Sequence, residues 1–236
     1  MTLLYLIIII LVFFFPFILS FDKKVHFYKR WRFLIPSIIL SMLIFIPWDI
    51  AFTDLQVWGF NPLYLKGLYF FNLPVEEVMF FIVVPYACVF IYDCLKYYQV
   101  KNYLIKNEVY ISLFLSTAFI VIGLLFNDRL YTTVTLLLTA SLILLNQFVF
   151  RLNFLSYFYQ AYLLMFIPFL VVNSILTGSF IPEEIVWYNN IDNLNLRIFT
   201  IPVEDIVYGF MLILLNLTFY NTLQQKLIKP QKQTNS

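Results

Sequence analysis

The sequence predicts an all-α, polytopic membrane protein with about seven transmembrane helices. Hydrophobic residues make up 62% of the chain, charged residues only 12%, and the mean hydropathy is +0.87. Several apolar runs are long enough to cross about 30 Å of hydrocarbon at about 1.5 Å per residue. They are continuously apolar rather than alternating, which favours helices over a β-barrel. We expect spans at 3–21, 33–50, 75–92, 109–126, 131–150, 157–176 and 203–220.

The first span is expected to stay in the mature protein as an anchor. No basic residue precedes its apolar run, no small-residue cleavage site follows it, and the positive charges come after it. A cleaved signal peptide shows the opposite arrangement of charge.

The distribution of basic residues predicts the orientation in the membrane. Only Lys66, Arg129 and Arg197 lie on one side of the predicted spans, among 15 Lys and Arg residues. Positive charge marks the cytoplasmic side, so we expect an inner (plasma) membrane protein with its N-terminus outside and its C-terminus in the cytoplasm. The charges lie in separate short loops, which speaks against a nucleic-acid partner. The other side carries Lys23, Lys24, Lys29, Arg30, Arg32, Lys96, Lys101, Lys106, Arg151, Lys226, Lys229 and Lys232.

A short string occurs twice and indicates an internal duplication. The chain reads FNLPVEEV at 71–78 and FTIPVEDI at 199–206, and upstream VW at 57–58 matches VW at 186–187. We therefore expect two three-helix repeats that run in the same direction, because an odd number of spans separates them. The predicted division is a first repeat at 1–94, a linker with the fourth helix at 95–130, a second repeat at 131–223 and a polar tail at 224–236.

Each copy of the string carries two acids at the start of a helix: Glu76 and Glu77, then Glu204 and Asp205. Proline and acids are also typical of an ordinary helix start, where negative charge complements the helix dipole. Their position at the lipid boundary favours function, because acids within membrane segments are costly and usually functional. Neighbouring residues on a helix point about 100° apart, so the two acids of a pair cannot both face one pocket.

A carboxyl group beside aromatic rings suits one kind of chemistry. It can protonate an apolar molecule, and the ring faces can stabilise the resulting cation. Phe80 lies on the helical stripe of Glu76, and Tyr208 lies on that of Glu204. For any single aromatic residue, packing or a place in an interfacial belt is the simpler interpretation.

Other chemistries lack their residues. His26 is the only histidine, and Cys88 and Cys94 are six apart on one predicted helix, so neither a metal site nor a cysteine–histidine nucleophile is expected. No G-x-G-x-x-G or P-loop string occurs, and we expect no cofactor. Asp49 follows Trp48 near the end of the second span, but its counterpart in the repeat alignment is Leu170, so a local cap or surface role is as good an interpretation as catalysis.

These motifs resemble the small membrane lycopene cyclase domain family, which occurs as two separate subunits or as a fused tandem. The resemblance rests on LPVEE at 73–77 with Phe80 and Phe81, and on IPVED at 201–205 with Tyr208, within two tandem three-helix units. It extends over nearly the whole chain. The chain is similar to the fused form.

The resemblance implies carotenoid biosynthesis, with the acyclic ends of lycopene converted to β-rings through γ-carotene to β-carotene. This is an isomerase (intramolecular lyase) reaction without net redox change. It makes Glu76 and Glu204 the candidate proton donors, while Glu77 and Asp205 tune them or accept the departing proton. The expected partners are lycopene and the lipid bilayer, and a homo-oligomer or contacts with other carotenoid enzymes remain open. Candidate substrate-binding residues are Phe80, Phe81, Tyr208, Trp58 and Trp187.

Two alternatives fit parts of the pattern. A membrane hydratase or prenyltransferase acting on carotenoid or polyprenyl chains would use a similar apolar pocket, although no D-x-x-x-D string for magnesium diphosphate is present. A non-enzymatic small transporter is the other alternative. Charge at the membrane midplane would favour it, whereas these acids lie at one boundary.

Overall fold

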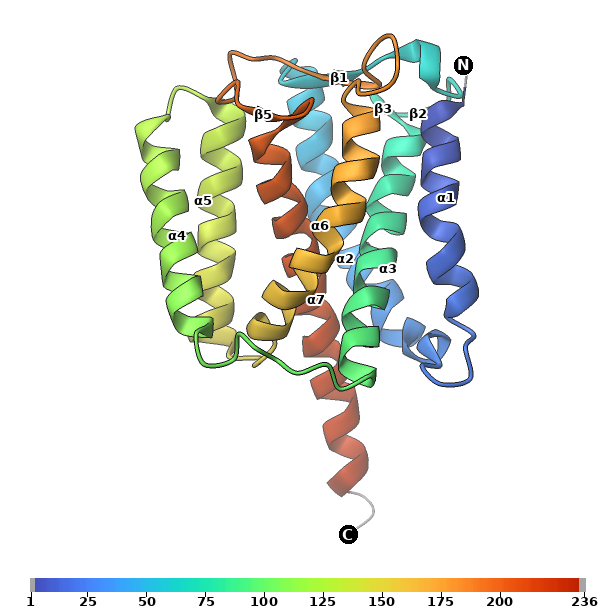
Figure 1. The fold of residues 1–236 in the computed structure, drawn as a ribbon, viewed down its shortest axis with the longest axis vertical. Helices are drawn as coiled ribbons and strands as arrows, with labels where there is room; N and C mark the ends of the chain where they lie inside the picture. The colour runs from blue at the N-terminus through green and yellow to red at the C-terminus, as the bar shows by residue number, and fades with distance from the viewer. Residues whose placement is uncertain (1–2, 234–236) are drawn as a thin grey trace.

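The computed structural model describes residues 3–233, with side chains through residue 226. Within this part of the chain, helices form one bundle, and the helix ends carry short strands at one end only (Figure 1). The helices are α1 (Leu4–Leu19), α2 (Trp31–Asp54), α3 (Val75–Tyr97), α4 (Glu108–Leu125), α5 (Leu130–Leu144), α6 (Leu155–Leu176) and α7 (Val203–Gln233). The predicted all-α architecture is confirmed.

Six of the described helices are long and apolar enough to cross a membrane. The first, α1, is apolar but has only 16 residues, fewer than the about 20 that a full crossing needs. Large apolar side chains cover the outside of the bundle, among them Phe15 on α1 and Phe114 on α4. Because lipid rather than water suits such a surface, the chain is a multi-pass membrane protein.

Helix ends differ from the apolar runs that predicted them. α2 starts before the predicted span and ends at Asp54, because polar residues can continue a helix beyond the hydrocarbon. The predicted fifth span divides into α5 and a π-helical segment, η3 (Leu145–Phe150). The predicted polar tail begins inside α7, which continues to Gln233; residues 234–236 lie outside the described part.

The two repeats share a tight hairpin before their last helix. Strands β2 (Tyr69–Phe70) and β3 (Leu73–Pro74) pair before α3, and β5 (Arg197–Ile198) and β6 (Ile201–Pro202) pair before α7. The turn residues Phe71 and Phe199 have matching positive φ values of 55° and 56°. Equal backbone conformations at equal positions show that the repeated string folds in the same way twice.

A third strand pair joins the two repeats. β1 (Trp58–Phe60) pairs antiparallel with β4 (Val186–Tyr188), and Gly59 lies opposite Trp187. A Cβ atom on Gly59 would lie 2.3 Å from the Trp187 ring, so the indole occupies space that only glycine leaves free. In the strand pair, Trp187 is thus the partner of Gly59, whereas the alignment of the two repeats by sequence matched Trp187 with Trp58.

A buried ion pair ties the helices together at the opposite end of the bundle. The Arg30 guanidinium lies 2.9 Å from the Asp93 carboxylate on α3, and the Tyr220 hydroxyl of α7 donates a hydrogen bond to the same carboxylate. Asp93 is only 2% exposed. These contacts connect the segment before α2 to α3 and α7, far from the strands.

Candidate active site

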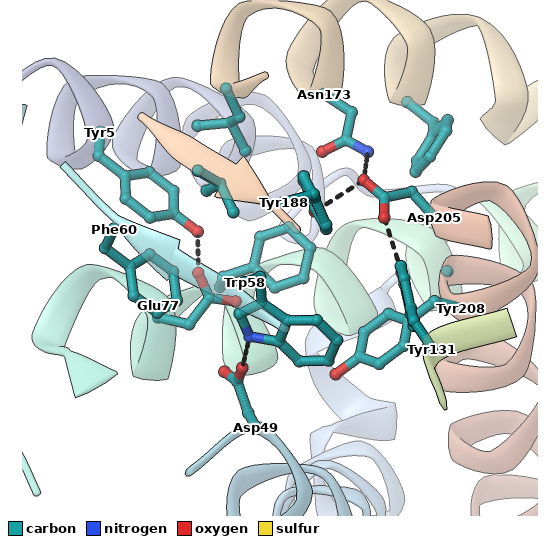
Figure 2. A pocket seen from close by; sticks show the side chains of 15 residues that line it. Tyr5, Asp49, Trp58, Phe60, Glu77, Tyr131, Asn173, Tyr188, Asp205 and Tyr208 are labelled. Carbon is teal, nitrogen blue, oxygen red and sulfur yellow. Dashed lines mark hydrogen bonds between the residues drawn. The ribbon is translucent and has the colours of Figure 1, made fainter. Parts of the chain in front are cut away.

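A polar chamber lies at the strand-bearing end of the bundle (Figure 2). We call it the acid chamber, because three carboxyl groups line its volume of about 60 Å³. Both repeats contribute to its wall, through all six of their helices and through β1 and β4. Its lining consists of Tyr5, Asp49, Trp58, Phe60, Glu77, Phe80, Tyr131, Phe169, Asn173, Leu176, Val186, Tyr188, Asp205, Tyr208 and Gly209.

Glu77 brings the first carboxyl group into the chamber from the first turn of α3. The hairpin of β2 and β3 ends at Pro74, which stands just before the helix and directs this turn toward α1. The Tyr5 hydroxyl of α1 donates a hydrogen bond of 2.5 Å to Glu77 Oε2. Such a short distance is typical of a hydroxyl that donates to a carboxylate.

Asp205 occupies the corresponding position at the start of α7 and accepts three hydrogen bonds. The donors are Tyr131 at 2.6 Å, Tyr188 at 2.8 Å and Asn173 Nδ2 at 3.1 Å. Burial raises the pKa of Tyr188, which lies on β4, and the nearby charge of Asp205 raises it further. Tyr188 therefore keeps its proton and acts as a donor.

Asp49 supplies the third carboxyl group; from the sequence, a cap or surface role and a catalytic role were equally good interpretations of this residue. It is 1% exposed, and Trp58 Nε1 donates a hydrogen bond of 2.6 Å to its Oδ1 (Figure 2). Its Oδ2 is buried without a hydrogen-bond partner among the described residues. Asp49 is thus part of the chamber wall.

Hydrogen bonds at the ends of α2 and α6 identify the counterpart of Asp49 in the second repeat. The Asn72 side chain donates to the carbonyl of Ile50, and the Thr200 hydroxyl donates to the carbonyl of Ser174. Because Asn72 and Thr200 match in the repeated string, Ile50 corresponds to Ser174, and Asp49 therefore to Asn173 rather than Leu170. The counterpart of the extra carboxyl is an amide that also lines the chamber.

Glu76 and Glu204 lie outside the chamber lining. Glu76 Oε1 accepts the backbone N–H of Lys66 at 2.7 Å, and Glu204 Oε1 accepts that of Leu194 at 2.8 Å. Both carboxyl groups are buried and bind the loop before each hairpin to the helix that follows it. The second acid of each pair faces the chamber. Because neighbouring residues on a helix point about 100° apart, the first acid then points elsewhere.

The predicted aromatic residues divide in the same way. Trp58, Phe80 and Tyr208 line the chamber. Phe81 is 1% exposed and packs in the core, beside Phe45. Trp187 packs over Gly59, and its neighbour Tyr188 reaches the chamber instead. Tyr188 faces the chamber and Trp187 does not, because neighbouring residues of a strand point to opposite faces.

An apolar groove of about 300 Å³ adjoins the chamber. The two share the lining residues Phe80, Phe169, Asn173 and Gly209, so the groove lies directly beside the chamber that holds the carboxyl groups. Its wall is formed by α1, α3, α6 and α7 and is almost entirely apolar. On α3 it extends from Phe80 to Ile91, roughly 16 Å at about 1.5 Å per residue. Other lining residues, Leu11 and Phe15, are exposed on the outer face of α1.

Metal ligands do not gather in this region. The described side chains include no group of three or more His, Cys, Asp and Glu residues that could share a metal ion. The chemistry available from the chain itself is therefore that of carboxyl, hydroxyl and aromatic groups.

The fold and the site define a class: a multi-pass membrane protein in which an apolar groove ends at buried acids. The family model for lycopene cyclase matches residues 2–95 and 128–223, most of the chain, and the protein belongs to that family. Membership makes it an enzyme of carotenoid cyclisation with a lipophilic carotenoid substrate. No curated protein and no solved structure matches the chain.

Proposed function

We propose that this protein is a lycopene β-cyclase that converts the acyclic ends of lycopene to β-rings, through γ-carotene to β-carotene. The observation that carries the proposal is the junction of the apolar groove with the acid chamber. A hydrocarbon chain in the groove brings its end to the carboxyl groups, where the reaction needs an acid.

The substrate enters from the bilayer rather than from water. Exposed Leu11 and Phe15 form part of the groove, so a carotenoid dissolved in lipid reaches it without crossing a polar surface. The groove volume of about 300 Å³ falls at the small end of the range for ligand pockets. It accommodates one part of a long polyene, while the remainder stays in the hydrocarbon.

The reaction is an isomerisation by acid–base steps. An acid transfers a proton to the terminal alkene, which leaves a tertiary cation, and the double bond five carbons along the chain attacks this cation to close the ring. A base then removes a ring proton and restores the alkene. One proton enters and one leaves, so neither redox change nor leaving group is involved.

The three chamber carboxyl groups supply the acid, the base and the negative charge that stabilises the cation. Glu77 and Asp205 lie on opposite sides of Trp58 in the view of Figure 2. The ring faces of Trp58 and Tyr208 add cation–π stabilisation in a space with little water. We therefore assign the chemistry to the second acid of each pair and to Asp49, and the positioning of the two helices to Glu76 and Glu204.

We also propose that the chamber faces the outer side of an inner (plasma) membrane. The strands and the chamber share the end of the bundle at which α1 begins (Figure 1). The connections α1–α2, α3–α4 and η3–α6, at the other end, carry seven of the 15 Lys and Arg residues, and Arg32 and Lys96 lie in the helix turns beside them. By the positive-inside rule, that end belongs in the cytoplasm.

Pigment analysis of a lycopene-producing host tests the function. Cells that express the wild-type chain should accumulate cyclic carotenoids, whereas the Glu77→Gln, Asp205→Asn double variant should leave lycopene. Membrane-inserted protein is measured in both by immunoblotting. Unchanged lycopene in cells that contain abundant wild-type protein in the membrane would refute the proposal.

A further inference from the structure

The three chamber carboxyl groups differ in the hydrogen bonds that they accept. Asp205 accepts three, from two tyrosines and an amide. Glu77 accepts one short bond from the Tyr5 hydroxyl. Asp49 accepts one bond, from the Trp58 indole, and its second oxygen has no partner. Since the two halves of the protein are duplicates, this difference distinguishes their chemistry.

Among the described residues, Asp49, Glu76 and Glu204 each have a buried carboxyl oxygen without a partner, and of these three only Asp49 lines the chamber. Such an oxygen has a simple explanation if it carries a proton. An ionised carboxylate buried at 1% exposure would leave a charged oxygen without any donor, which is strongly unfavourable. A neutral carboxylic acid needs only one acceptor site filled, and the indole N–H fills it. The O–H of such an acid has no acceptor within hydrogen-bond distance among the described residues and is free to meet an apolar ligand.

The neighbouring carboxyl group supports the same distribution of charge. Asp49 and Glu77 both line the chamber, whose volume is only about 60 Å³. Two carboxyl groups that share so small a buried cavity do not both ionise readily, so the pair holds one proton. The Tyr5 hydroxyl donates to Glu77 and stabilises it as the carboxylate, which leaves the proton on Asp49.

We propose that Asp49 is the proton donor of the cyclisation, that Glu77 is the base, and that Asp205 is a fixed negative charge opposite the cation; this assignment rests on the proposed cyclase function. Asn173, the counterpart of Asp49 in the second repeat, cannot supply a proton of this kind. The first repeat is thus the acid–base half and the second the electrostatic half.

The proton balance closes within the first repeat. The O–H bond of Asp49 breaks as a C–H bond forms at the terminal alkene carbon, and the substrate becomes a cation. After ring closure, a ring C–H bond breaks, its electron pair becomes the new double bond, and Glu77 takes the proton. Transfer from Glu77 to its neighbour Asp49 restores the starting state without any other reactant.

The test combines pigment analysis with infrared spectroscopy of purified protein in lipid. Asp49→Asn keeps the acceptor for Trp58 but removes the proton, so cyclisation should fall by about 10²-fold or more at equal protein level. The C=O band of a protonated carboxylic acid, which shifts in D₂O, should be present in the wild type, and the difference spectrum against Asp49→Asn should show the loss of one such carboxylic acid. Asp54→Asn is the matched control: Asp54 lies on the same helix, exposed and outside the chamber, and should change neither readout.

The outcomes separate the two proposals. A wild type that makes no cyclic carotenoid but shows a band that decreases in Asp49→Asn refutes the cyclase function and leaves the protonation of Asp49 standing. A wild type that cyclises lycopene while Asp49→Asn cyclises it within about twofold, or has an unchanged band, refutes the assignment of Asp49 and leaves the function standing. Retention of partial activity in Asp49→Glu, which restores a carboxylic acid, would support the assignment.

Discussion

At the scale of single residues, adjacent acids in one motif have different tasks. Glu76 accepts a backbone N–H and holds a loop, whereas Glu77, one position further on, accepts a tyrosine hydroxyl inside the chamber. The same division separates Glu204 from Asp205. Helical rotation alone requires that the two acids of each pair point in different directions.

Paired substitutions measure this division. Glu77→Gln removes a titratable group from the chamber, and we expect cyclisation to fall by about 10²-fold or more with little change in unfolding. Glu76→Gln keeps an oxygen for the Lys66 N–H, so activity should stay within a few-fold while the free energy of unfolding falls by about 1 kcal/mol. Pigment yield and thermal unfolding in lipid provide the two measurements. If Glu76→Gln instead abolished cyclisation while Glu77→Gln retained it, Glu76 and not Glu77 would be the catalytic acid of this pair.

The sequence predicted the acidic motifs but not their orientation. Periodicity shows that Glu76 and Glu77 diverge, yet only the packing of α3 against α1 shows which of them meets Tyr5. The role of Asp49 stayed undecided for another reason. Alignment of the repeats at their prolines placed it opposite Leu170, because the segment between the proline and the helix end is longer in α6 than in α2. Trp187 was predicted as a substrate-binding residue in place of Tyr188, because the sequence does not reveal a one-residue shift in strand register.

At the scale of elements, the seven helices were predictable because lipid demands long apolar runs. The short strands were not, since two or three residues carry no periodic signal. They nevertheless position the site: each hairpin begins a helix that bears an acid, and the β1–β4 pair places Trp58 and Tyr188 in the chamber.

Gly209 on α7 lines both the groove and the chamber and adds no side chain to the space between them. A Cβ atom there would already lie 3.4 Å from Phe169 and 3.5 Å from the Tyr162 hydroxyl. We expect Gly209→Leu to block the passage, so that lycopene accumulates in cells. Leu124→Phe, on the lipid-facing surface of α4, is the control and should cyclise normally at the same protein level. Full activity in Gly209→Leu would mean that the substrate arrives by another route.

At the scale of the whole molecule, two repeats build one chamber instead of two. Tyr5, Asp49 and Glu77 come from the first repeat, and Tyr131, Asn173 and Asp205 come from the second. The lining therefore depends on both halves at once. Under the proposed function, we therefore expect both ends of the substrate to react in this shared chamber rather than one end in each half.

A single chamber predicts that the two ends react in separate visits. Purified protein in lipid, without added nicotinamide, flavin or divalent metal, should form the monocyclic γ-carotene first and β-carotene after a lag. Chromatography of a time course measures both. A partly inactivating substitution such as Tyr131→Phe should slow the two steps together. Formation of β-carotene without any free monocyclic intermediate would contradict separate visits.

The charge distribution predicts the orientation of the molecule. A reporter fused to the C-terminus should be active if it works in the cytoplasm and silent if it requires the outer side, because the basic connections lie at that end of the bundle. The complementary fusion in the loop after α4, which follows Leu125, should behave in the opposite way. Activity of an outer-side reporter at the C-terminus would place the chamber on the cytoplasmic face.

The pairing of Asp49 with Asn173 across duplicated halves has a stereochemical consequence. An achiral polyene end has two equivalent faces, but a chamber with its acid in one half and an amide in the other presents the proton to one face only. In D₂O, the new ring methylene should therefore carry deuterium in one of its two mirror-related positions. Deuterium NMR in a chiral liquid crystal distinguishes them, and equal occupancy would show that the alkene is protonated from both sides.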